Sequence, residues 1–191
     1  MKKILLFIII PIISLLHAQS DKVQVGEQSD MSKMLKSSGS LLLKESYSLP
    51  NIKTTYGNDI EASIYIIDNM LSDESNPQLG LRLSLKGEYS TKRALIDFDE
   101  LEGLLSSINI IQEKRMSLCT NPSIEIPEDS DNSTEIDYIS KDGFKFGAYV
   151  GKKNKLKYAV QVSRTADWAF LKDAGVETLK ENINTVMNIK K

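Results

Sequence analysis

The chain has few of the residues on which nucleophilic and metal chemistry usually depend. Its 191 residues include one cysteine, Cys119, and one histidine, His17. A single cysteine excludes an intramolecular disulfide, so stability must come from a packed core. If His17 is removed with a leader, as argued next, the mature chain also lacks the serine-histidine-acid triad, a histidine-activated cysteine and histidine-based zinc sites. The glycine-rich phosphate-binding patterns are absent too.

No hydrophobic run in the sequence reaches the ~20 residues that a membrane-spanning helix needs. The longest run, residues 4–16, follows Lys2 and Lys3 and ends shortly before Ala18, which is the plan of a secretory signal peptide. We therefore expect residues 1–18 to be a signal peptide that is cleaved after Ala18. The mature protein should then be secreted or periplasmic, with no stable insertion in the membrane.

Positive charge is scarce in the expected mature chain. Loss of Lys2 and Lys3 with a leader that holds no acid changes the formal net charge from −2 to −4. A mildly acidic protein gains no long-range attraction to nucleic acid or to anionic membranes, so neither partner is favoured. A protein, a peptide or a glycan remains as the expected class of partner, and no cofactor is implied.

What the sequence has in quantity is alternation of apolar and polar residues. Residues 19–40 are polar and lack aromatic side chains, so we expect a flexible lead-in followed by a single folded domain over 41–191. The clearest alternation is LGLRLSL at residues 79–85, and strict alternation predicts antiparallel strands with one buried face. Similar patterns predict further strands near 41–49, 60–66, 92–96, 136–138, 144–150, 156–162 and 168–170.

Two amphipathic helices are predicted, each after a group of strands. The first has apolar residues at i, i+3, i+4, i+7 and i+10 from Leu101, and the second has an apolar stripe from Val176 to Val186. At an offset of 75 residues, two strands and the helix of the first half (about 41–115) fall on their counterparts in the second half (about 120–191). The sequence therefore predicts an α+β fold made of a duplicated antiparallel ββββα unit, with the helices packed on one sheet face.

This order of elements resembles the whirly fold of single-stranded-DNA-binding transcription cofactors over roughly residues 41–190, and more distantly the duplicated fold of the TATA-binding protein. The resemblance implies an architecture and, by analogy of fold, single-stranded nucleic-acid binding as one alternative function. The leader, with its Ala-Gln junction at residues 18–19, resembles those of secreted Bacteroidota-type bacterial families without an assigned function.

A dense group of carboxylates lies at the predicted strand-to-helix junction, in ALIDFDELE at residues 94–102. Its members are Asp97, Asp99, Glu100 and Glu102. With Asp97 as N-cap, Glu100 takes position N3, which is the spacing of a capping box, and Ile96 and Leu101 take the positions of a hydrophobic staple. The alternative is a divalent-cation site or a carboxylate-based hydrolase that uses Asp97, Asp99 and Glu102. We favour the cap, and we assign no catalytic, cofactor or metal residue.

Three other features carry charge or reactivity. An acidic loop could chelate calcium but lacks the glycine of the EF-hand pattern; its carboxylates are Glu128, Asp129, Asp131 and Glu135. The lysine-rich hairpin tip at 151–157, beside Tyr149 and Tyr158, could contact phosphate or single-stranded nucleic acid. We interpret both as solvated surface, and Cys119 as unreactive without a histidine partner.

The sheet faces turned away from the helices offer the best candidate binding surface. Alternation predicts that five side chains project there: Arg82, Lys86, Lys145, Tyr149 and Lys157. We therefore expect a secreted or periplasmic binding or interaction module that is not an enzyme. The carboxylate-based hydrolase or cation-binding protein and the single-stranded nucleic-acid binder are the alternatives.

Overall fold

The computed structural model describes residues 28–72, 76–114, 134–151 and 155–189. The helices are α1 (Asp30–Lys36), the 3₁₀ turn η1 (Phe98–Glu100), α2 (Leu101–Glu113) and α3 (Asp173–Met187). The strands are β1 (Leu42–Ile52), β2 (Ile60–Asn69), β3 (Gln78–Lys86), β4 (Thr91–Asp97), β5 (Thr134–Ile139), β6 (Lys145–Gly151), β7 (Lys155–Gln161) and β8 (Ala169–Leu171). The predicted signal peptide lies outside the described residues, and among the described helices none is long and apolar enough to cross a membrane.

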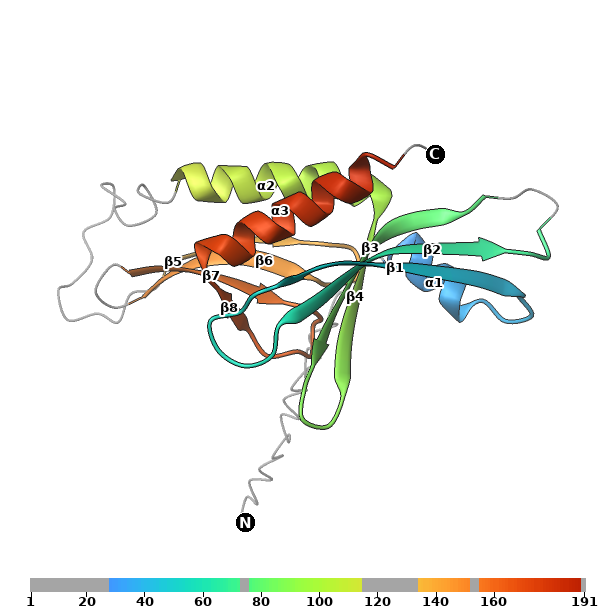
Figure 1. Cartoon of the computed structure of the whole chain (residues 1–191), viewed down its shortest axis with the longest axis horizontal. Helices are drawn as coiled ribbons and strands as arrows, with labels where there is room; N and C mark the ends of the chain where they lie inside the picture. The colour runs from blue at the N-terminus through green and yellow to red at the C-terminus, as the bar shows by residue number, and fades with distance from the viewer. Residues whose placement is uncertain (1–27, 73–75, 115–133, 152–154, 190–191) are drawn as a thin grey trace, which may run out of the picture.

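The strands form two four-stranded antiparallel sheets, in the orders β1-β2-β3-β4 and β5-β6-β7-β8. A helix follows each sheet along the chain, α2 after the first and α3 after the second (Figure 1). The predicted α+β class and the duplicated ββββα unit are therefore confirmed. The offset of 75 residues relates β3 to β7, β4 to β8 and α2 to α3.

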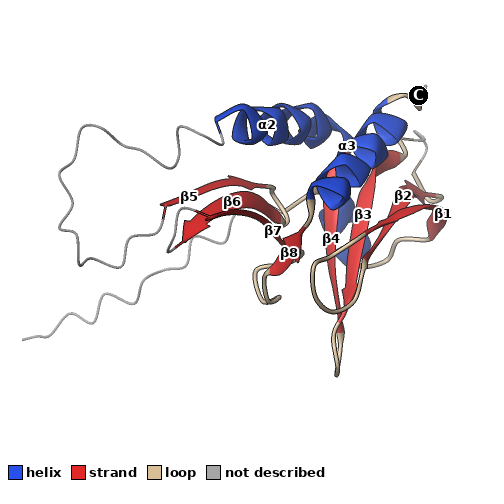
Figure 2. Ribbon diagram, turned by 60° about the vertical axis from the view of Figure 1, so that its left-hand side comes forward, coloured by secondary structure: helices blue, strands red, loops and turns tan. Residues whose placement is uncertain are grey.

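The two long helices lie on the same side of the sheets, and each covers mainly the other half's strands (Figures 1 and 2). α2 packs on β5 and β6, whereas α3 packs on β1 and β3 as well as on β8. The result is one continuous core, whose fully buried members include Leu81 and Leu104 from the first half and Phe146 and Leu179 from the second. Alternation explains it, because the inward side chains of all the central strands are apolar.

The predicted apolar face of β1 is present but largely uncovered. Leu43 and Tyr47 are 48% and 53% exposed, although Ala62 and Leu83, on the same face of neighbouring strands, are buried. β1 is the edge strand of its sheet, and the β1–β2 hairpin extends beyond the ends of the helices (Figure 1). The helices therefore cover only the end of β1 near Ile52.

The N-terminal helix α1 differs from the expected flexible lead-in at 19–40. It packs on the face of the first sheet opposite to α2 and α3, where Met31 is fully buried against Tyr65, Ile67 and Leu95. The Ser29 side chain caps the helix by accepting the Ser32 N–H at 3.0 Å. The prediction was wrong for these residues because the polar composition of the whole segment hides a short apolar stripe at Met31, Met34 and Leu35.

The halves are also joined at the edge of the second sheet. The loop after β1 extends that sheet, since Thr54 forms an antiparallel bridge with Leu171 and the Thr55 N–H donates to the Phe170 carbonyl at 2.7 Å. Asn182, buried on α3, donates from Nδ2 to the Pro50 carbonyl at 2.9 Å. The second sheet is thus held in place by the first half of the chain.

Candidate functional site

The acidic junction at residues 97–102 forms the predicted capping box between Asp97 and Glu100. Glu100 Oε2 accepts the Asp97 N–H at 3.3 Å, and Glu100 Oε1 accepts the Lys141 N–H at 2.7 Å. The Asp97 carboxylate accepts the N–H groups of Asp30 at 2.5 Å and Met31 at 3.2 Å, at the start of α1. The two acids therefore join α1, the β4–α2 junction and the β5–β6 turn.

Burial dominates the electrostatics of this junction. It raises the pKa of Asp97 and the pKa of Glu100, although the backbone N–H donors act in the opposite direction. Lys141 Nζ lies 2.8 Å from Asp99 Oδ2 and 3.9 Å from Asp97 Oδ2, and its hydrogen bond to Asp99 raises the pKa of Lys141. Asp99 and Glu102 are exposed. The buried oxygens are already bonded to backbone, which leaves little for an ion or a substrate.

The other predicted features fall in several places. Cys119 and the acids Glu128, Asp129 and Asp131 lie outside the described residues, as do tip residues 152–154. In the part of the chain that the structure describes, no group of three or more histidine, cysteine, aspartate and glutamate side chains is placed to hold a metal ion. Arg82 projects from the outer face of the first sheet and Lys86 is exposed at the end of β3, as alternation predicted.

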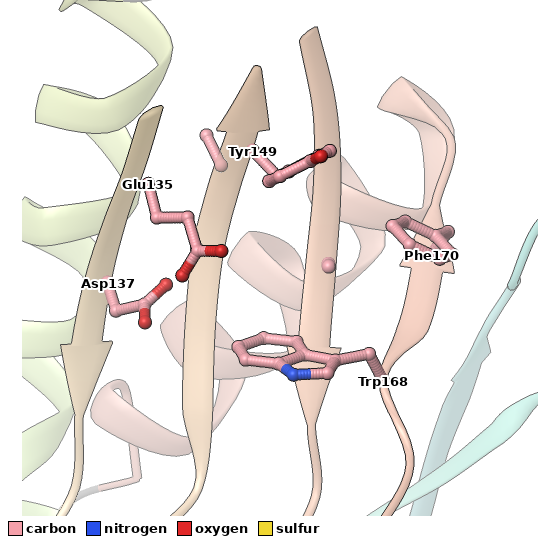
Figure 3. Close-up of a pocket in the computed structure, with 8 residues that line it drawn as sticks. Glu135, Asp137, Tyr149, Trp168 and Phe170 are labelled. Atoms are coloured by element: carbon pink, nitrogen blue, oxygen red, sulfur yellow. The ribbon is translucent and has the colours of Figure 1, made fainter. Parts of the chain in front are cut away.

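A groove lies on the outer face of the second sheet, the face turned away from α2 and α3 (Figure 3). Strand register places four residues side by side across the sheet, one from each strand: Asp137, Gly147, Ala159 and Phe170. Glu135 and Tyr149 form the next row, and Trp168 immediately precedes β8. The groove has a volume of about 190 Å³, and these seven residues line it together with Ala148.

The floor of the groove is low because its central residues are small. A Cβ at Gly147 would collide with Asp137 Oδ1 and would lie 2.7 Å from the Ile136 carbonyl oxygen. Only glycine fits at this position, and it allows the Asp137 carboxylate to lie over the strand. Ala159 adds a single methyl group beside it. The surrounding aromatic rings are therefore accessible from the groove.

Aromatic rings stand on three sides of the groove, and the carboxylates of Glu135 and Asp137 stand on the fourth (Figure 3). Trp168 is 40% exposed. Both acids are exposed, and within the described residues neither carboxylate has a hydrogen-bond or ion-pair partner. An open surface of this composition is suited to binding, since ring faces supply apolar contact and the acids supply hydrogen-bond acceptors.

Two lysines on the same face stack on these rings. Lys145 Nζ lies 5.8 Å from the centre of the Trp168 ring, and Lys157 Nζ lies 5.3 Å from the centre of the Phe170 ring. Both distances are in the range of cation–π attraction. Lys145, Tyr149 and Lys157 thus project on the outer face as the sequence predicted, although neither lysine lines the groove.

The sequence analysis missed four lining residues: Glu135 as part of this face, Asp137, Trp168 and Phe170. The signal that could have found the aromatic pair is the alternation of Trp168 and Phe170 with the buried Ala169 and Leu171. Two aromatic residues on the outward side of a strand are unusual enough to indicate a surface with a use.

Comparison with known proteins gave no match, either to a family model or to a curated protein. The groove itself must therefore carry the functional argument. Its acids, Glu135 and Asp137, come from one strand and stand on one side (Figure 3). Hydrolysis by two carboxylates needs groups on opposite sides of the bond, so the arrangement favours binding over catalysis.

Proposed function

We propose that the protein is a secreted or periplasmic binding module without enzymatic activity, and that the groove on the outer face of the second sheet holds its ligand. The observation that supports this function is the enclosure of a glycine-and-alanine floor by three aromatic rings and two carboxylates that lack partners among the described residues. Exposed aromatic side chains gathered in one depression mark interaction sites more often than solvated surface. The leader-like N-terminus supports secretion.

The alternatives receive less support from the same observations. A hydrolase or cation site at Asp97, Asp99 and Glu102 would need carboxylates turned toward a shared space, whereas Asp97 is bonded to α1 and Asp99 to Lys141. Single-stranded nucleic acid would have to approach aromatic rings that stand beside Glu135 and Asp137, whose charge repels phosphate.

Trp168 makes the proposal directly testable, because it is the single tryptophan of the chain and lies in the groove wall. We expect a ligand found by screening peptides, glycans and cations against the mature protein to change Trp168 fluorescence and to raise the melting temperature. Tyr149→Ala should remove both responses. Tyr47→Ala, which removes a half-exposed tyrosine from a strand of the other sheet, should leave them intact.

A different pattern would overturn the assignment. A ligand that stabilises the protein equally in Tyr149→Ala and Tyr47→Ala, and that leaves Trp168 fluorescence unchanged, binds elsewhere. Turnover of a screened compound by the wild-type protein, lost in Glu135→Gln, would show an enzyme instead.

A further inference from the structure

The groove is polar at one end and aromatic around the rest of its wall. Asp137 and Glu135 stand on β5 at one edge of the sheet, and Phe170 stands on β8 at the other. Three strand spacings separate β5 from β8, a distance of about 14 Å. A ligand that fills this length must therefore combine an apolar body with a group that two carboxylates attract.

We propose that the groove binds the side chain of an arginine or a lysine that a peptide or protein partner presents, an inference that rests on the binding function proposed above. These side chains have a long aliphatic stem and a cationic head. The stem would lie over Gly147 and Ala159 between Tyr149 and Trp168. The head would reach the carboxylates of Glu135 and Asp137.

The carboxylates suit a cationic head because they have no partner to give up among the described residues. A guanidinium group donates paired hydrogen bonds to carboxylates and stacks on aromatic faces, so arginine uses both kinds of wall. An anionic ligand would be repelled by the same two acids. A neutral glycan could stack on Trp168, but it would cover Glu135 and Asp137 without compensating their charge.

The protein's own lysines show that these rings hold cations. Lys145 and Lys157 place their ammonium groups 5.8 Å and 5.3 Å from the centres of the Trp168 and Phe170 rings. Neither lysine is among the residues that line the groove, so both leave it open. The acidic net charge of the chain adds long-range attraction for a basic partner.

The experiment uses a pentapeptide with blocked ends and one central arginine, and the same peptide with citrulline, which has nearly the shape of arginine without its charge. Trp168 fluorescence of the mature protein reports binding of each. We expect the arginine peptide to bind with a Kd on the order of a millimolar, as suits a single side chain. The citrulline peptide should bind at least about tenfold more weakly, because a charge-assisted pair is lost.

A matched pair of double variants tests the role of the acids. Glu135→Gln with Asp137→Asn should weaken the arginine peptide at least about tenfold. Glu61→Gln with Glu102→Gln removes the same net charge from exposed acids outside the groove and should have little effect. All four positions are exposed, so the variants should fold, and an unchanged melting temperature confirms it.

Three results would overturn the inference. Equal binding of the citrulline peptide, equal loss in both double variants, or no fluorescence change with the arginine peptide at 10-fold above the expected Kd would each do so. A neutral tetrasaccharide such as cellotetraose that changes Trp168 fluorescence in a Tyr149-dependent way, while the arginine peptide does not, would refute the basic ligand and leave the binding groove standing. Peptide binding that is independent of both Trp168 and Tyr149 would refute both.

Discussion

Replacing Asp97 with alanine should loosen α1 from the first sheet. The Asp97 carboxylate is buried and accepts the N–H groups of Asp30 at 2.5 Å and Met31 at 3.2 Å. A hydrogen bond to a charged acceptor contributes about 1.5–3 kcal/mol. The Met31 donor is buried and would stay without a partner, whereas the partly buried Asp30 donor can turn to water. We therefore expect a loss of about 2–4 kcal/mol in the free energy of unfolding.

Urea unfolding measures this loss, and amide hydrogen exchange at Asp30 and Met31 shows whether it arises at α1. Asp99→Ala, two residues further along, is the control. Its side chain is 67% exposed and pairs with Lys141, so it should cost only about 0–1 kcal/mol. If Asp97→Ala and Asp99→Ala are equally stable, or if the two amides keep their protection in Asp97→Ala, the proposed role of the carboxylate is refuted.

Two further substitutions test the junction and the groove. Burial raises the folded-state pKa of Glu100 above 4.5, so the folded protein binds that proton more tightly than the unfolded chain and the carboxylate costs stability progressively as the pH rises above 4.5 through the raised pKa. The stability of Glu100→Gln relative to wild type should therefore increase with pH across this window in urea unfolding, and a decrease would contradict the sign. Gly147→Ala should cost about 1–3 kcal/mol in thermal unfolding because the new Cβ meets the Ile136 carbonyl and displaces Asp137. Ala159→Gly, its neighbour in the same row, should cost no more than about 1 kcal/mol, and equal melting temperatures for Gly147→Ala and wild type would show that the glycine is not required.

Local patterns predicted the parts of the fold that local forces determine. Alternation at residues 79–85 identified β3 and its buried face, and the spacing of Asp97 and Glu100 identified the helix start. Both depend on residues that are neighbours in the sequence. The offset of 75 residues added the duplication, because two strands and a helix must keep their register for the same core to form twice.

The remaining features depend on residues that meet only after folding. Asp97 caps α1 across 67 positions of sequence, and no spacing rule connects an acid to a helix so far away. The groove needs one residue from each of four strands in register, with Gly147 and Ala159 in the centre. In sequence these are ordinary outward residues, which are read as solvated unless the pairing is known. The aromatic Trp168 and Phe170 were the one local sign of the groove.

The crossed placement of α2 and α3 has an evolutionary consequence. α2 covers β5 and β6 of the second unit, and α3 extends over β1 and β3 of the first. A single ββββα unit would leave the apolar face of its own sheet partly bare. An ancestor encoding one unit would therefore have been stable only as a twofold pair that exchanged helices. Gene duplication and fusion made that exchange intramolecular, and freed the outer faces of the two sheets to diverge.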